Sequence, residues 1–144
     1  SFLLTAAGEE IGWRGFLLPQ LAKTWNIRVA VLFGGLIWAV WHFPLILSGH
    51  YLVGTPVWYK LPVFTIEILA MTAILAALRL RSNSIWPAVV LHASHNYIDY
   101  MICSPMTENG ISLYFVGETG IITAVIACLI AVILVNKKSS RMMG

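Results

Sequence analysis

The chain has 144 residues, of which 59% are hydrophobic and 10% are charged, and its formal net charge is +3. Soluble domains are about 45–50% apolar and about 25% charged, so this composition excludes a soluble globular domain and a disordered chain. It also excludes a nucleic-acid-binding protein, which needs a dense face of lysine and arginine. The remaining class is an integral membrane protein of one domain, with room for about four or five helical spans.

Five apolar segments follow one another along the chain, and each is predicted to be a membrane-spanning helix. They are, in order, Ser1–Leu21, Val29–Leu47, Pro62–Leu78, Ile85–Ile102 and Gly120–Val135. Pro44 and Ser48–Gly49 are predicted to mark the end of the second segment, whereas Pro87 lies in the first turn of the fourth, where proline is tolerated. The predicted fold class is an all-α, multi-pass transmembrane helix bundle.

Basic residues alternate along the chain in a pattern that predicts its topology. The loop Lys23–Arg28, the turn Arg79–Arg81 and the tail Lys137–Arg141 are basic, whereas connection 48–61 holds one lysine and connection 103–118 holds no lysine or arginine. The positive-inside rule therefore places the three basic segments together on the cytoplasmic side.

Polar side chains lie inside three of the predicted spans, where one charge costs roughly 2.5–3.5 kcal/mol on insertion scales. They are Glu9, Glu10 and Arg14 in the first, His42 in the second, and His92, His95, Asn96 and Asp99 in the fourth. Because lipid cannot satisfy them, they must face one another or a water-filled cavity. The sequence therefore predicts a polar site within the membrane, built from three helices. The fifth span has no ionisable residue and is predicted to be a lipid-facing scaffold.

Helical spacing groups these side chains further. The four polar residues of the fourth span follow at i, i+3, i+4 and i+7, which puts them on one helix face. Glu10 and Arg14 are four residues apart and are predicted to pair. Glu9 lies about 100° around the helix from Glu10, so its carboxyl is free to point elsewhere.

Several further residues have a plainer interpretation. His95 is expected to support or pack, and Asp99 is expected to be interfacial or to orient a histidine. Glu67, alone in the third span, is either a hydrogen bond within the bundle or a group lining the cavity. Cys103 and Cys128 are expected to form no disulfide and to supply no nucleophile, because no basic group is spaced to activate either thiol. Aromatic residues at span ends, among them Tyr51, are predicted to be interface anchors.

Three motifs occur in order on separate apolar segments: Glu9-Glu10-x-x-x-Arg14, then Trp38-x-x-x-His42, then His92-x-x-x-Asn96. Over Thr5–Tyr100 the chain resembles the CPBP family, the CAAX-protease and bacteriocin-processing intramembrane proteases, which include the Rce1-type prenyl-protein endopeptidases. The second motif of that family usually begins with Phe. Trp38 stands there in this chain, and we expect it to pack behind the histidine with little chemical consequence.

The resemblance implies amide hydrolysis by an activated water, which needs a base and electrophilic help at the carbonyl. It implies that Glu9 activates the water and that Asn96 donates a hydrogen bond to the oxyanion, with the Glu10–Arg14 pair in support. It implies that His42 and His92 either position the water or hold a divalent metal such as zinc. The chain has no HExxH pattern, so metal-bound and metal-free sites both stay open.

The function predicted from this resemblance is an intramembrane endopeptidase acting on a membrane-associated peptide or protein, with a prenylated CAAX-like peptide as one possible substrate. The alternative is a non-enzymatic immunity or accessory protein that binds a peptide or partner in the membrane. A transporter or proton relay is also consistent with buried Glu and His, but the spans are few and no pair of broken helices is evident. We expect residues 1–144 to be one membrane domain, the C-terminal core of a longer protein with further N-terminal spans, in a bacterial cell membrane.

Overall fold

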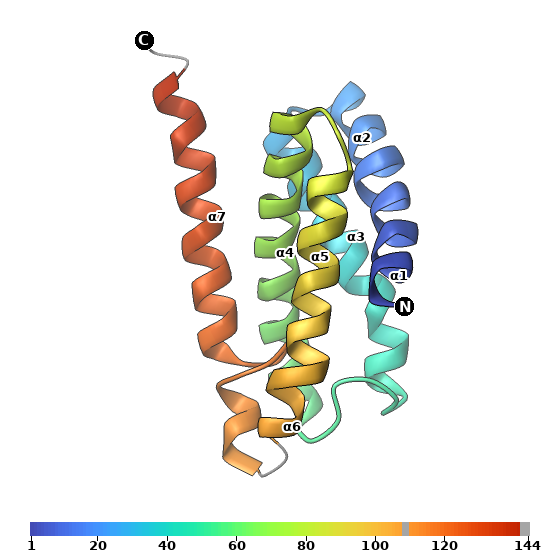
Figure 1. The fold of residues 1–144 in the computed structure, drawn as a ribbon, viewed down its shortest axis with the longest axis vertical. Coiled ribbons are helices and arrows are strands. Elements are labelled where there is room, and N and C mark those ends of the chain that lie inside the picture. The colour runs from blue at the N-terminus through green and yellow to red at the C-terminus, as the bar shows by residue number, and fades with distance from the viewer. Residues whose placement is uncertain (108–109, 142–144) are drawn as a thin grey trace.

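The computed structural model describes residues 1–107 and 110–141, and every regular element among them is helical (Figure 1). The elements are, in order, α1 (Phe2–Glu10), η1 (Ile11–Leu17), α2 (Leu18–Thr24), α3 (Ile27–Leu47), α4 (Val57–Ser82), α5 (Trp86–Ile98), η2 (Asp99–Cys103), α6 (Ser104–Met106), η3 (Gly110–Tyr114) and α7 (Ile121–Arg141). The predicted all-α class is confirmed. Two of these helices, α3 and α4, are long and apolar enough to cross a membrane, and α7 contains a shorter apolar stretch at Ile121–Asn136.

The first predicted span is continuous helix through α1, η1 and α2, but its middle turns are wider than an α-helix. Residues Ile11–Leu17 form a π-helix, in which each N–H bonds to the carbonyl five residues back. Such turns are rare and are frequently found at functional sites. This one begins directly after Glu10 and carries Arg14, so the acidic motif lies where the helix changes its winding.

The predicted end of the second span at Leu47 is confirmed, although Pro44 lies inside α3 and does not mark that end. The predicted start of the third span at Pro62 was wrong, because α4 begins five residues earlier, at Val57. Prolines are tolerated inside membrane helices because neighbouring groups satisfy the freed carbonyls. The connection between α3 and α4 is therefore shorter than predicted. The fourth span also ends differently, since α5 stops at Ile98 and the chain continues as the π-helix η2.

The three basic segments lie at one end of the molecule. The α2–α3 turn, the α4–α5 turn and the end of α7 are all at the top of Figure 1, which agrees with their predicted location on one side of a membrane. Asn26 caps α3 by accepting a hydrogen bond from the N–H of Val29 at 3.1 Å, and Asn83 closes α4 in the left-handed conformation. The side chains of Lys137–Arg141 and residues 108–109 of the predicted loop 103–118 lie outside the described residues.

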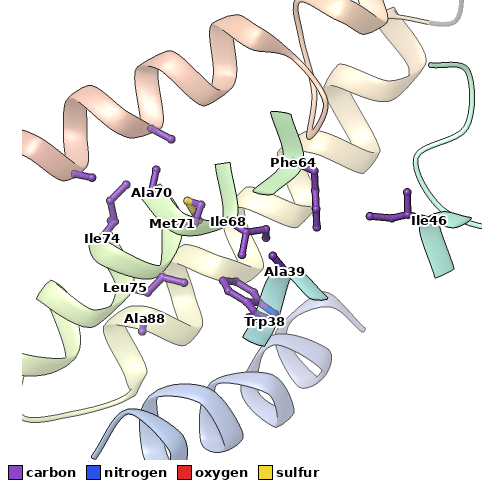
Figure 2. Close-up of a cluster of buried hydrophobic side chains, with 12 residues drawn as sticks. Trp38, Ala39, Ile46, Phe64, Ile68, Ala70, Met71, Ile74, Leu75 and Ala88 are labelled. Carbon is purple, nitrogen blue, oxygen red and sulfur yellow. The ribbon is translucent and has the colours of Figure 1, made fainter. Parts of the chain in front are cut away.

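The hydrophobic core is centred on α4, which contacts α3, α5 and α7 (Figure 2). Its buried members are Trp38, Ala39, Ile46, Phe64, Ile68, Ala70, Met71, Ile74, Leu75, Ala88, Ala127 and Ala131. Many are alanines, and small residues allow membrane helices to approach closely. The outer face of α7 exposes large Ile, Val and Leu side chains, as expected of a scaffold helix facing lipid.

Gly35 is a point of close approach between α3 and α4. A Cβ there would lie 2.9 Å from Leu69 Cδ2 and 3.1 Å from Thr72 Oγ1. The neighbouring Gly34 has only one such neighbour, Leu21 Cδ1 at 3.8 Å, which is an ordinary contact. These adjacent glycines therefore differ in packing while sharing one helix.

We predict that Gly35→Ala destabilises the full-length protein and that Gly34→Ala does not. Both changes gain about 0.5–1 kcal/mol of helix preference. Only the change at Gly35 meets a packed neighbour, and such overpacking costs about 1–3 kcal/mol. Thermal unfolding in detergent compares the two variants. Equal Tm values would contradict the close approach of α3 and α4.

Candidate active site

A cavity of about 520 Å³ opens between α1, α3, α4 and α5. The four predicted catalytic residues, Glu9, His42, His92 and Asn96, all line it. They come from three helices and are up to 87 positions apart in the sequence, so only the fold brings them together. The remaining lining residues are Ser1, Phe2, Thr5, Trp38, Trp41, Leu45, Tyr51, Phe64, Glu67, Ile68, Met71, His95, Tyr100 and Glu118.

Glu10 and Arg14 lie behind the cavity wall rather than on it. The Glu10 residue is 0% exposed and Arg14 is 2% exposed. Arg14 Nη1 donates to Glu10 Oε1 at 2.9 Å, so the predicted pair is present, and His92 Nδ1 lies 2.9 Å from the same oxygen. Because a carboxylate bound to arginine only accepts, His92 Nδ1 carries the proton and Nε2 is the nitrogen left for the cavity. Glu10 therefore fixes both the orientation and the tautomer of His92.

Glu9 points away from Glu10, as the helical spacing predicted. Its Oε2 accepts a hydrogen bond from the indole Nε1–H of Trp38 at 3.0 Å. The expectation that Trp38 would only pack was therefore wrong, because this bond is one that the phenyl ring of Phe cannot make. The Arg14 guanidinium lies 4.3 Å from the centre of the Trp38 ring, a cation–π contact on the buried side.

His42 is oriented by the same tryptophan. Its Nδ1 lies 2.9 Å from the main-chain carbonyl of Trp38, one turn earlier in α3, so Nδ1 donates and Nε2 is available to the cavity. The ring stacks on Tyr51 with centroids 5.8 Å apart and meets Phe64 edge-on at 5.2 Å. Trp38 also contacts the His92 ring at 5.3 Å. One side chain thus touches Glu9, Arg14 and His92, and its carbonyl holds His42.

The cavity has polar residues that the sequence analysis did not assign to it. Tyr51, predicted to be an interface anchor, instead lines the cavity and donates a hydrogen bond to Glu118. Burial raises the pKa of the Glu118 carboxyl to about 7, and burial together with that carboxyl raises the pKa of the Tyr51 hydroxyl. No spacing in the sequence points to these two loop residues.

The third predicted span also contributes to the site, so the prediction of three helices was one too few. Glu67 of α4 lines the cavity, which selects one of the two interpretations left open for it. His95 lines the cavity as well, and its Nε2 lies 3.7 Å from Glu67 Oε1. Asp99 is not among the lining residues and hydrogen-bonds to the main chain of Glu118 rather than orienting a histidine. Cys103 and Cys128 are free thiols.

The donor atoms around the cavity bear on whether it suits a metal ion. His42 and His92 each bind an oxygen through Nδ1, the arrangement usual for histidines that ligate a metal through Nε2. Across residues 1–107 and 110–141, however, no three His, Cys, Asp or Glu side chains gather closely enough to hold an ion. The donor set is therefore short of the three protein ligands that a catalytic zinc site uses.

Comparison with known proteins gives the family. Residues 1–98 match the family model described as type II CAAX prenyl endopeptidase Rce1-like. Over 141 residues the chain is 31% identical to CAAX prenyl protease 2 of Methanococcus maripaludis, and this alignment covers 94% of the chain and 48% of that protein. The chain thus spans about half the length of this curated relative, and no solved structure matches it significantly. The chain belongs to the Rce1-like family of type II CAAX prenyl endopeptidases.

Proposed function

We propose that this chain forms the catalytic core of an intramembrane endopeptidase that hydrolyses a peptide bond in a membrane-associated substrate. One observation carries the proposal: Glu9, His42, His92 and Asn96 converge on a single cavity inside an apolar helix bundle. Each polar group is costly within a bilayer, so a pure scaffold has no reason to gather them. This argues against the immunity or accessory role.

In the proposed mechanism, Glu9 is the general base. Its Oε2 is held by the Trp38 indole, which leaves Oε1 to take a proton from a water molecule. The water oxygen attacks the carbonyl carbon while His42, through Nε2, holds the water in position. The side-chain amide of Asn96 donates to the developing oxyanion, whereas Nε2 of His92, which carries no proton, joins His42 in positioning the water. Glu9 then passes its proton to the amide nitrogen as the carbon–nitrogen bond breaks.

The proposed substrate is a peptide carried by a lipid anchor, and a prenylated peptide ending in a CAAX sequence is the first to test. The printed name of the Methanococcus maripaludis relative, CAAX prenyl protease 2, supports this class. Apolar side chains such as Phe2, Leu45 and Met71 line the cavity together with its polar residues, so the cavity suits a substrate that has both a hydrocarbon chain and a peptide.

We predict that Glu9→Gln and His92→Ala each lower cleavage by about 10²–10⁴-fold, because each removes a group that acts on the reacting atoms. The assay is cleavage of a quenched, farnesylated CAAX peptide by the purified full-length protein in detergent. Ser94→Ala, at an exposed position in α5, is the matched control and should retain wild-type activity. Near-normal cleavage by Glu9→Gln would overturn the assignment of the base.

We predict that Trp38→Phe lowers kcat by about 10- to 100-fold with little change in KM. A hydrogen bond to a charged group is worth about 1.5–3 kcal/mol, and this one orients the base rather than the substrate. Trp13→Phe is the control, because the Trp13 and Trp38 ring centroids lie 6.3 Å apart and the buried Nε1 of Trp13 has no hydrogen-bond partner in the part of the chain that the structure describes. Equal losses in the two variants would mean that only packing matters.

In a second form of this proposal, the site binds a divalent ion, with His42 and His92 as its ligands and zinc as the first ion to test. It would polarise the carbonyl or the water. Since the side chains alone supply a base and an oxyanion donor, we predict that cleavage persists after dialysis against a strong chelator. The opposite outcome is that the chelator abolishes cleavage and that added zinc restores it in the wild type but not in His42→Ala. That outcome would establish the metal-bound form.

A further inference from the structure

Glu67 has surroundings unlike those of the other polar residues in the cavity. It lies in the middle of α4, lines the cavity and is 2% exposed. Neither of its carboxyl oxygens has a hydrogen-bond partner among the described residues. His95 Nε2 lies 3.7 Å from Oε1, which is too long for a hydrogen bond. By contrast, Glu9 and Glu10 are each held by a donor.

An unpartnered buried carboxyl opposes folding. Moving such a group out of water without a hydrogen bond is unfavourable, and native structures contain only a few buried groups of this kind. The cost is larger inside a membrane helix bundle, where few donors lie within reach of a side chain. A group that destabilises the empty protein and lines its cavity is therefore expected to gain its donor from something that enters the cavity.

The charge around Glu67 indicates which chemistry that ligand has. Among the described residues that line the cavity there are three carboxylic acids, Glu9, Glu67 and Glu118, and no lysine or arginine. This lining disfavours an anionic group beside the three acids and favours a hydrogen-bond donor. An extended peptide presents main-chain N–H groups along its length, and each needs an acceptor once it leaves water.

The carboxyl can reach such a donor at small cost. Both oxygens now lie beneath the surface of the cavity wall, but the last torsion of a glutamate side chain is broad and has no strongly preferred angle. Rotation about that bond breaks no hydrogen bond, because the carboxyl makes none. The side chain of His95, whose Nε2 is 3.7 Å from Glu67 Oε1, is 24% exposed and therefore has room to move.

We propose that Glu67 is a substrate-binding residue that accepts a hydrogen bond from a main-chain N–H of the bound peptide, on a different wall from Glu9. This rests on the proposed function, since it takes the ligand to be a peptide. Glu67 then helps to place the scissile bond against Glu9 but takes no part in the chemistry.

The test separates binding from cleavage. The affinity of a fluorescent, farnesylated CAAX peptide is measured with the full-length Glu9→Gln variant in detergent micelles, with and without Glu67→Leu. We expect roughly tenfold weaker binding without the carboxyl. With wild-type Glu9, Glu67→Leu should raise KM and leave kcat within about threefold. Ile66→Leu, on the exposed face of the same turn, should change neither quantity.

Two further measurements distinguish a binding role from a structural one. Glu67→Leu should raise Tm by about 2–4 °C, because it removes an unpaired buried carboxyl, whereas loss of a structural contact would lower Tm. The second measurement uses peptides methylated at successive main-chain nitrogens. Methylation at one of these nitrogens should weaken binding to the protein that retains Glu67, and the same methylation should have no further effect on binding to Glu67→Leu.

The outcomes are separable. Unchanged peptide affinity together with a lower Tm in Glu67→Leu would overturn the role of Glu67 and leave the proposed function intact. Full cleavage by Glu9→Gln would overturn the proposed catalytic base, and the KM of Glu67→Leu with wild-type Glu9 would still decide the role of Glu67.

Discussion

The rest of the site depends on the buried carboxylate of Glu10. It receives Arg14 from its own helix and His92 from α5, so a single oxygen atom joins two helices that are far apart in the sequence. In the interior of a bundle such a group is tolerated only when charged and polar partners satisfy it together. The contact between α1 and α5 is therefore electrostatic as well as apolar, and it fixes where His92 meets the cavity.

Trp38 connects the third helix to this arrangement. Its indole binds Glu9, its ring contacts Arg14 and His92, and its carbonyl binds His42. A rotation of α3 that moved His42 would also withdraw the indole from Glu9. The base and the histidine are thus coupled through one residue, which explains how side chains from separate helices hold a common geometry without direct bonds between them.

Much of this arrangement was predictable from the sequence because polar residues are rare in apolar spans. The spacing of His92, His95 and Asn96 indicated one helix face, and the spacing of Glu10 and Arg14 indicated their ion pair. The indole bond of Trp38 was missed because spacing along one helix does not reveal contacts between helices. Tyr51 and Glu118 were missed because loops have no periodicity. Glu67 could be noticed as a lone acid, but only the fold shows that it lines the cavity.

The π-helix of Ile11–Leu17 has a consequence for where the acidic motif points. A π turn holds more residues than an α turn, so Ile11–Leu17 wind the helix through less than the 100° per residue of an α-helix. If the same residues wound as a regular α-helix, Glu9 and Glu10 would turn relative to α2 and move away from Trp38 and His92. The winding of this stretch, and not only its sequence, therefore places the acidic motif against α3 and α5.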